Sequence, residues 1–363
     1  MLACLAMITL AAPPVQAADG DARLQPVAVF GTDDRVPLPA RYQKLRESLG
    51  VFFNPRTHTI CSGFCVADNV VATAGHCLFK TAGERPPRLA DFWFARNYDS
   101  LRDYARIAGF STGAAPQNVL AGSTRLRIKP PIDATSDWAL VRLTRPICAR
   151  RALPVIQLTT AEIERQSDAG RVFQVSYHRD FTLWRPAYSK PCRVARDYPQ
   201  ADWKTIAADF TVPERLLLHT CDTGGASSGS PLLLDGPTGV SVLGINVGTY
   251  VQARMTVEDG GTKQALRTDT VANTGVAAIA FANRIAAFAE ARVLGTAAQI
   301  RELQAQLARR GYYDGVVDGT FGPDLRSAIE VYERASGQPV TGIASEPLLR
   351  ALAEAPARRS QAR

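Results

Sequence analysis

The chain has 363 residues, of which 46% are hydrophobic and 21% are charged, so it is long enough to bury a sizeable core and to form two domains. Its net charge of +8 favours contact with anionic surfaces, but the basic residues are dispersed and no helix-turn-helix, zinc-finger or RNA-binding signature accompanies them, so we expect no nucleic acid partner. No apolar stretch approaches the roughly 18 residues of a transmembrane helix, so we also expect no transmembrane anchor.

The N-terminal residues 1–17 have the pattern of a secretory signal peptide. Leu2–Ala12 form a short apolar run, and the small side chains that follow suit signal peptidase, so cleavage is expected after Ala17. One element of the pattern is absent, because no Lys or Arg precedes the apolar run. This interpretation predicts an exported protein, either periplasmic or extracellular.

Six cysteines remain after such a cleavage, and an even number suits disulfides in an oxidising compartment. Buried free thiols are the alternative, but a signal peptide argues against them. The six residues are Cys61, Cys65, Cys77, Cys148, Cys192 and Cys221.

Residues 27–251 contain many short runs of Val, Ile, Leu and Phe, separated by Gly, Pro, Asn and Asp. This spacing predicts an antiparallel all-β sandwich or barrel. Ala277–Leu294 is instead rich in alanine, with apolar residues such as Ile279 at helical spacing, and predicts a helix that closes this first domain, 27–294. The strand candidates are Thr59–Val66, Val70–Ala74, Trp138–Leu143 and Val240–Val247.

A second, all-α pattern follows Gly295. Apolar residues from Ile300 to Leu307 recur at helical spacing, and Gly311 can end that helix. A loop over 312–323 precedes helices at 324–336 and 345–352, with Ser345 as the N-cap of the last. We expect a small three-helix domain over residues 296–353 and a disordered basic tail over 354–363.

Three short segments contain residue types that together catalyse acyl transfer. His76 follows an apolar strand in the segment 73–77, and Asp137 stands at the mouth of the next apolar run. Ser228 lies in a loop of small residues, a type that exposes a serine and offers backbone N–H groups to an oxyanion. These residues supply a nucleophile, a base and an acid that orients the base.

The serine loop also fits another hydrolase pattern. Residues 225–229 read G-x-S-x-G, the nucleophile elbow of α/β-hydrolases, in which Ser227 would be the nucleophile. That fold needs a histidine after the serine, and no histidine follows His219. The esterase interpretation is therefore disfavoured.

The three segments resemble the trypsin/chymotrypsin superfamily, whose motifs T-A-A-H-C, D-I-A-L and G-D-S-G-G-P occur in the same order. The resemblance implies an all-β double β-barrel in which Ser228 is the nucleophile, His76 the general base and then acid, and Asp137 the residue that orients His76. It also implies an oxyanion hole made by the N–H groups of Ala226 and Ser228, with no cofactor and no metal.

Within the superfamily, the chain is similar to bacterial glutamyl-endopeptidase-like enzymes. Residues 30–35 resemble their N-terminal segment, and residues 228–231 read S-G-S-P as theirs do. Two residues depart from the wider pattern. Ala226 replaces the oxyanion-hole glycine, and Ser227 replaces the aspartate that pairs with a newly cut N-terminus in trypsin-like enzymes. Activation through that ion pair is therefore not expected.

The resemblance also implies a specificity pocket. Asn246 stands where glutamyl endopeptidases carry a histidine that reads the substrate carboxylate, so a strict preference for glutamate is not expected. Asp222 would select Lys or Arg in the substrate if its carboxylate faced the pocket. Otherwise its carboxylate would cap a turn next to a disulfide. The implied pocket residues are Asp222, Thr223, Asn246, Val247, Gly248 and Thr249.

A Cys61–Cys77 disulfide is implied by matching family positions. It would clamp the strand that leads to His76 against its neighbour. The other four cysteines allow three pairings. Of these we favour Cys192–Cys221 together with Cys65–Cys148.

Residues 296–352 resemble peptidoglycan-binding domains of the three-helix type. The resemblance implies peptidoglycan as a partner, contacted by exposed aromatic rings that stack on sugars. Asp318 and its neighbouring glycines either contribute to binding or only shape a turn. The implied binding residues are Tyr312, Tyr313, Asp318 and Phe321.

These observations predict a secreted serine endopeptidase that cleaves protein or peptide substrates and is held at the cell wall by its C-terminal module. The altered residue of the oxyanion hole leaves an alternative, a weak or inactive protease scaffold that acts as a wall-binding or interaction protein. The complete set of nucleophile, base and acid favours the enzyme.

Overall fold

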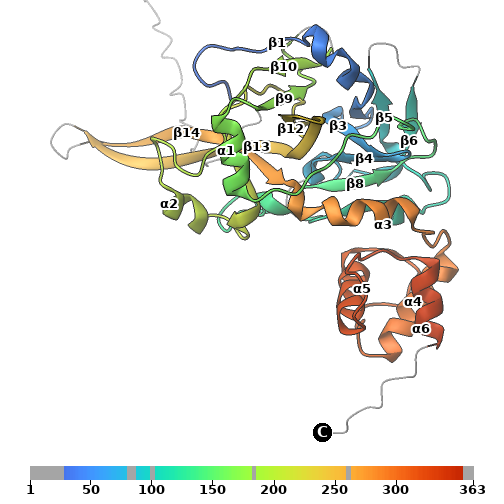
Figure 1. Cartoon of the computed structure of the whole chain (residues 1–363). Coiled ribbons are helices and arrows are strands. Elements are labelled where there is room, and N and C mark those ends of the chain that lie inside the picture. The colour runs from blue at the N-terminus through green and yellow to red at the C-terminus, as the bar shows by residue number, and fades with distance from the viewer. Residues whose placement is uncertain (1–27, 80–86, 99–102, 182–184, 259–262, 355–363) are drawn as a thin grey trace, which may run out of the picture.

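The computed structural model describes residues 28–79, 87–98, 103–181, 185–258 and 263–354. Two antiparallel seven-stranded sheets form a double β-barrel, and three helices form a C-terminal module, so both expected fold classes are observed (Figure 1). The predicted signal peptide and residues 355–363 of the predicted tail lie outside the described residues. Within the described part of the chain, no helix is long and apolar enough to cross a membrane.

The first sheet has the strand order β6-β5-β2-β3-β4-β8-β7. The predicted strands near Thr59, Val70 and Trp138 correspond to β3, β4 and β8, and each is almost entirely buried, as expected for strands that face a barrel core. The strands are β2 Leu49–Asn54, β3 Thr59–Ala67, β4 Val70–Thr73, β5 Trp93–Arg96, β6 Tyr104–Arg106, β7 Val119–Ala121 and β8 Ala139–Arg142.

The second sheet has the order β1-β10-β9-β12-β13-β14-β11. The predicted strand Val240–Val247 is only the first part of β13, which pairs with β14 in a long hairpin that projects beyond the barrel (Figure 1). The strands are β1 Val36–Pro37, β9 Val172–Ser176, β10 Ala187–Ser189, β11 Leu216–His219, β12 Pro231–Gly236, β13 Gly239–Glu258 and β14 Lys263–Ala277.

Two α-helices of the barrel domain were not predicted. Helix α1, Thr160–Asp168, begins with a capping box between Thr159 and Glu162, which satisfies its first N–H groups. Helix α2, Trp203–Ala208, begins at Asp202, whose carboxylate accepts an N–H of the first turn at 2.8 Å. Short 3₁₀ helices lie at Ala40–Glu47, Gly75–Cys77, Leu89–Asp91, Pro116–Asn118, Ala134–Ser136, Pro213–Arg215, Ala278–Ala280 and Ala282–Arg284.

The predicted helix Ala277–Leu294 is wrong in its first half. Only α3, Ile285–Glu290, is α-helical, and two 3₁₀ turns precede it. Residue 277 is held extended because β14 still pairs there with β13, and this tertiary pairing overrides the helix propensity of the local alanines. The turns bury Phe281 completely but leave Ile279 45% exposed, although Ile279 was expected on the buried face.

The C-terminal module contains α4 Ala297–Arg309, α5 Pro323–Ala335 and α6 Glu346–Glu354, close to the predicted bounds. Helix α4 begins with a capping box between Thr296 and Gln299. Leu294 was assigned to the first domain, but its side chain is fully buried in the core of the module. The other buried apolar residues of this core are Ile300, Leu303, Leu307, Phe321, Leu325, Ala328, Ile329, Tyr332, Ala344, Leu348 and Leu352.

Candidate active site

His76 forms two hydrogen bonds with the carboxylate of Asp137. Its ring Nδ1 lies 2.7 Å from Asp137 Oδ2, and its backbone N–H donates to Oδ1 at 2.8 Å. The Asp137 side chain is 9% exposed and the His76 side chain 29%, so the carboxylate is sheltered while the imidazole remains accessible. A buried carboxylate that accepts from Nδ1–H leaves the lone pair on Nε2, which is the arrangement of a general base.

Strand register brings these two residues together. Thr73 of β4 pairs with Ala139 of β8, so the turn after β4 and the residues before β8 meet at one end of the first sheet. Gly75 allows this approach, because a Cβ at that position would lie 3.1 Å from Asp137 Oδ1. A side chain there would therefore push the carboxylate away from the imidazole.

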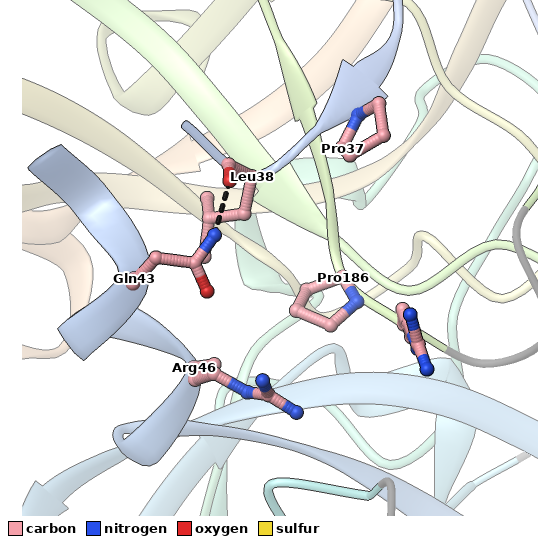
Figure 2. Close-up of a pocket in the computed structure, with 6 residues that line it drawn as sticks. Pro37, Leu38, Gln43, Arg46 and Pro186 are labelled. Carbon is pink, nitrogen blue, oxygen red and sulfur yellow. Dashed lines mark hydrogen bonds between the residues drawn. The ribbon is translucent and has the colours of Figure 1, made fainter. Parts of the chain in front are cut away.

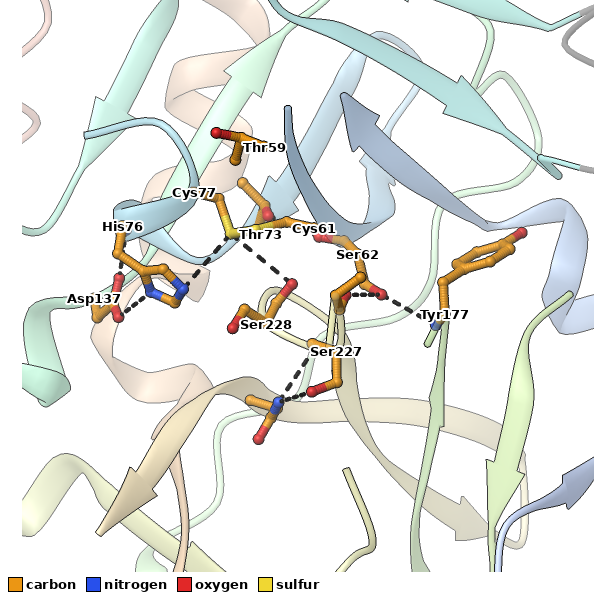
Figure 3. Close-up of a disulfide and its surroundings, with 12 residues drawn as sticks. Thr59, Cys61, Ser62, Thr73, His76, Cys77, Asp137, Tyr177, Ser227 and Ser228 are labelled. Carbon is orange, nitrogen blue, oxygen red and sulfur yellow. Dashed lines mark hydrogen bonds and ion pairs between the residues drawn. A yellow bond between two sulfur atoms is a disulfide. The ribbon is translucent and has the colours of Figure 1, made fainter. Parts of the chain in front are cut away.

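Ser228 reaches the same place from the second sheet, in the loop before β12. Its carbonyl accepts the N–H of Ser62 at 2.8 Å, and the Cys77 sulfur lies 3.9 Å from this carbonyl oxygen and 3.9 Å from His76 Nε2. Figure 3 shows the Ser228 side chain pointing toward the His76 ring. The three predicted catalytic side chains therefore meet at the junction of the two sheets.

The turn at Ser228 depends on Gly229. This glycine has a φ of +86°, a conformation that L side chains rarely adopt. A Cβ there would also lie 2.2 Å from Thr73 Oγ1 and 2.3 Å from the Ser62 carbonyl oxygen. The first sheet thus packs directly against the backbone that follows the serine, which fixes the serine relative to the end of β4.

The peptide between Gly225 and Ala226 is held by a hydrogen bond to its carbonyl. The Gly225 carbonyl accepts the N–H of Arg179 at 2.7 Å, and in a trans peptide the adjoining N–H points the opposite way. Among the described residues, nothing accepts a hydrogen bond from the N–H of Ala226 or of Ser228. Both donors are thus available to a substrate oxygen.

Ala226 holds this orientation at a cost. Its φ of +81° is left-handed, which disfavours any residue with a β-carbon by roughly 1–2 kcal/mol. The buried Ser62 hydroxyl offsets part of this cost by donating a hydrogen bond to the Ala226 carbonyl at 2.9 Å. The Ser62 hydroxyl oxygen itself accepts the Tyr177 N–H at 3.1 Å. Sequence reasoning missed Ser62, because nothing in the pattern C-S-G-F indicates a partner more than 160 residues away.

Ser227 faces away from His76, into the second sheet. The Asn246 amide donates to the Ser227 carbonyl at 3.2 Å and to its hydroxyl at 3.3 Å. The Asn246 oxygen in turn lies 3.1 Å from Nε2 of His219, and complete burial lowers the pKa of His219 to about 4. The neutral His219 therefore donates its Nε2–H to Asn246, and this buried chain orients Ser227 where trypsin-like enzymes use an ion pair.

Asp222 is committed to the backbone of the N-terminal segment. Its two carboxylate oxygens accept the N–H groups of Phe30 and Asp34, each at 2.8 Å, and the residue is only 2% exposed. Thr223 binds the same segment, since its N–H donates to the Ala28 carbonyl at 3.0 Å. The structure favours the interpretation in which Asp222 bonds backbone rather than substrate.

Replacing Asp222 with asparagine tests this interpretation. The NH₂ of the new amide would face one of the two backbone N–H groups, and two donors cannot form a hydrogen bond. We therefore expect Asp222→Asn to destabilise the fold by about 1–3 kcal/mol. We expect no change in the residue after which peptides are cut. Chemical denaturation and a cleavage profile of a peptide library measure the two effects. Loss of cleavage after Lys or Arg alone, at unchanged stability, would instead identify Asp222 as the reader of substrate charge.

The residues expected to form the wall of the pocket are uncharged. Thr249 Oγ1 donates to Asn273 Oδ1 at 2.7 Å, and the Asn273 amide donates to the Cys221 carbonyl at 2.8 Å. Val247 is buried at 5% exposure, and Gly248 lies between it and Thr249. Asn273, like His219, was not predicted, because it comes from a strand that the sequence pattern did not identify.

The three disulfides pair as the sequence favoured. Cys61 is joined to Cys77, Cys65 to Cys148, and Cys192 to Cys221. The Cys61–Cys77 bridge ties β3 to the turn that carries His76 (Figure 3). His76 and His219 each lie near two of these cysteines, but disulfide sulfurs are not thiolates and do not offer the ligands of a zinc site.

The module residues expected to bind glycan have different environments. Asp318 and Tyr313 stabilise their own loop, since Asp318 accepts the Gln304 amide at 3.0 Å and the Tyr313 hydroxyl donates to the Val316 carbonyl at 3.0 Å. Phe321 is 8% exposed and belongs to the core, and Tyr312 packs edge-on against Tyr332. The same loop exposes two apolar side chains that the sequence did not single out, Val316 at 76% and Val317 at 43%.

One small cavity lies away from this constellation. It has a volume of about 160 Å³ and lies between β1, the following 3₁₀ helix and the start of β10 (Figure 2). The Gln43 amide donates to the Leu38 carbonyl inside it. None of the expected catalytic or pocket residues lines it, so we assign it no part in the chemistry. Its lining residues are Pro37, Leu38, Gln43, Arg46, Arg185 and Pro186.

A double β-barrel with a serine, a histidine and an aspartate at the junction of its sheets defines the class of trypsin-like serine hydrolases. Residues 61–245, more than half of the chain, match the family model of the trypsin-like peptidase domain. The chain therefore belongs to the trypsin-like peptidase family and is a serine endopeptidase by class. Residues 296–352 match the model of a peptidoglycan binding domain.

Three solved proteases align with this chain at low sequence identity. A Glu endopeptidase solved in complex with MPD is 16% identical, with a TM-score of 0.46, and the match covers 72% of this chain and 100% of that one. The thermostable serine protease AL20 from an extremophilic microorganism is 18% identical, with 64% and 91% covered and a TM-score of 0.39. Protease Anisep from Arthrobacter nicotinovorans is 14% identical, with 64% and 89% covered and a TM-score of 0.39. The comparison with curated proteins gave no match.

Proposed function

We propose that the protein is an exported endopeptidase that acts at the cell wall with Ser228 as its nucleophile. The observation that carries this proposal is the pair of hydrogen bonds between His76 and Asp137, next to Ser228. That geometry fixes the ring of His76 and leaves Nε2 unprotonated on the side of the serine, which a purely structural histidine would not require.

The reaction follows from these positions. Ser228 Oγ attacks the carbonyl carbon of the scissile bond while its proton passes to His76 Nε2, and the imidazolium that forms is stabilised by Asp137. The carbonyl oxygen becomes negative and accepts hydrogen bonds from the N–H groups of Ala226 and Ser228. His76 then returns the proton to the departing amine. Water, deprotonated by the same imidazole, hydrolyses the acyl-enzyme and restores Ser228.

The alternative of an inactive scaffold depended on the β-carbon of Ala226. The hydrogen bonds around the Gly225–Ala226 peptide support the enzyme, because the Gly225 carbonyl already accepts the N–H of Arg179 and no described residue accepts the N–H of Ala226. Labelling with a fluorophosphonate distinguishes the two. An enzyme reacts stoichiometrically and loses the reaction in Ser228→Ala, whereas folded protein that is never labelled would support the scaffold.

We further propose that the enzyme prefers uncharged side chains at the residue before the cut. The carboxylate of Asp222 is hydrogen-bonded to backbone N–H groups, and the side chain of Asn246 is hydrogen-bonded to Ser227 and His219. The remaining wall, Thr249 and Asn273, is neutral and internally bonded. A charged substrate side chain would be desolvated there without a partner of opposite charge. A peptide-library cleavage profile dominated by Glu, Lys or Arg would refute this preference.

Tethering to peptidoglycan is the proposed role of the module. Truncation should be made after Ala291 rather than Leu294, because Leu294 belongs to the module core and the Ala291 carbonyl accepts the barrel residue Arg142 at 2.6 Å. We expect the shortened enzyme to cleave a small soluble peptide at nearly the rate of the full chain, and to lose co-sedimentation with purified sacculi.

Ionic strength is the control for this truncation. The net charge of +8 would itself attract anionic wall polymers, but that attraction is screened by salt. The measurement is therefore made at low and at high ionic strength. Full sedimentation of the truncated enzyme at high salt would contradict the tethering role.

A further inference from the structure

A second and larger cavity lies between the module and the first sheet. Its volume is about 640 Å³, within the range of sites that hold small ligands. None of His76, Asp137 and Ser228 lines it, so it is separate from the reacting atoms. The residues that matter for its chemistry are Phe79, Arg88, Phe110 and Arg125 from the barrel domain, and Phe321 and Arg326 from the module.

The two walls of the cavity are held at a fixed separation by Arg326. Its guanidinium donates to the carbonyls of Val119 at 2.6 Å and Ala121 at 3.3 Å. These carbonyls belong to β7, an edge strand of the first sheet, whose polar groups would otherwise need water. A second link joins Arg284 of the barrel domain to Glu330 of α5 at 3.7 Å. The cavity therefore depends on both parts of the chain.

The barrel side of the cavity is also braced. The guanidinium of Arg106 donates to the Ala90 carbonyl at 2.6 Å and lies over the Phe110 ring, 4.1 Å from its centroid. Ala90 and Phe110 both line the cavity. This bracing holds an apolar surface open beside the module rather than letting it collapse.

The charge of the lining is of one sign. Among the described residues that line the cavity, Arg88, Arg125 and Arg326 are charged, and none is an aspartate or glutamate. Arg326 is bonded to β7, but Arg88 and Arg125 are exposed and form no ion pair with any carboxylate of the described residues. Two guanidinium groups that no described carboxylate pairs with, in a lining that also has three phenyl rings, form a site for a ligand that is both anionic and partly apolar.

We propose that this cavity is an exosite that binds an acidic peptide. Carboxylates of the peptide pair with Arg88 and Arg125, and its apolar side chains pack against Phe79, Phe110 and Phe321. A peptide fits better than a glycan chain, because each guanidinium group can form two parallel hydrogen bonds to one carboxylate group. One lining residue, Phe79, belongs to the turn that carries His76, since its N–H donates to the Gly75 carbonyl at 2.9 Å. A bound peptide would be held near the scissile bond without occupying the oxyanion hole.

Binding can be measured without turnover, in the Ser228→Ala variant of the full chain. The probe is a fluorescein-labelled pentapeptide with two glutamates and a free carboxyl terminus, followed by fluorescence anisotropy. Its control is the same peptide with glutamines and an amidated terminus. We expect the acidic probe to bind at least about tenfold more tightly than the neutral one, because each charged hydrogen bond contributes a measurable part of the affinity. High salt should weaken the binding.

Variants locate the binding in this cavity. We expect Arg88→Gln combined with Arg125→Gln to weaken binding of the acidic probe at least about tenfold. Arg171→Gln, which replaces an exposed arginine just before β9 of the other sheet, should leave this binding unchanged. Both cavity arginines are exposed, so their replacement should not affect folding, and circular dichroism checks this. Equal binding of acidic and neutral probes, or equal loss in Arg171→Gln, overturns the proposal. Since no turnover is involved, such a result leaves the proposed catalytic mechanism untouched.

Discussion

Ser228→Ala is expected to abolish peptidase activity, lowering kcat by roughly a millionfold, whereas Ser227→Ala should keep a rate within about tenfold of the wild type. The difference follows from the two environments. The Ser228 side chain points toward His76, while the Ser227 hydroxyl accepts a hydrogen bond from Asn246 on the far side of the loop. Initial rates on a soluble peptide, with fluorophosphonate labelling of each variant, measure both effects.

Ser227→Ala is the matched control, because it removes a hydroxyl one residue away and leaves the Ser227 carbonyl bonded to Asn246 at 3.2 Å. If Ser227→Ala were the inactive variant and Ser228→Ala retained labelling, the assignment of the nucleophile would be incorrect. The α/β-hydrolase elbow would then have to be reconsidered despite the double-barrel fold.

Local sequence patterns and the family resemblance were sufficient to predict the fold class, and they singled out three side chains that the structure brings to the junction of the two sheets. His76, Asp137 and Ser228 each stand beside a strand end, and in an antiparallel barrel the register of buried strands determines which ends meet. The helices of the module were predicted for a related reason. Their apolar residues recur at helical spacing and pack only on one another, so no distant partner is needed to recognise them.

Residues that act through distant partners were not predicted. Ser62 holds the oxyanion loop from more than 160 residues away, and Asn246 was considered as a pocket residue whereas its amide is bonded to Ser227 and His219. Arg326 appeared only as a helix residue of the module, yet it binds the edge of the first sheet. Such roles depend on which surfaces meet in three dimensions, and sequence spacing carries no signal for them.

Asp137→Asn is expected to lower kcat by about ten-thousandfold at neutral pH while leaving the fold intact. The structure gives the reason. One carboxylate oxygen accepts the backbone N–H of His76 at 2.8 Å, and that donor has no alternative form. The new amide must therefore keep its oxygen there and turn its NH₂ toward the imidazole. The ring can respond only by accepting at Nδ1, which places its proton on Nε2 and removes the base that Ser228 needs.

The control for this variant is Asp133→Asn, which removes a carboxylate bonded to the exposed Arg127 a few residues earlier in the same segment. We expect Asp133→Asn to retain nearly full activity, because an exposed ion pair contributes little to stability and does not touch His76. Fluorophosphonate labelling of Asp137→Asn should slow in parallel with kcat, since both reactions require the same proton transfer from Ser228. An Asp137→Asn enzyme that kept its rate within tenfold of the wild type would show that the tautomer of His76 is set by something other than Asp137.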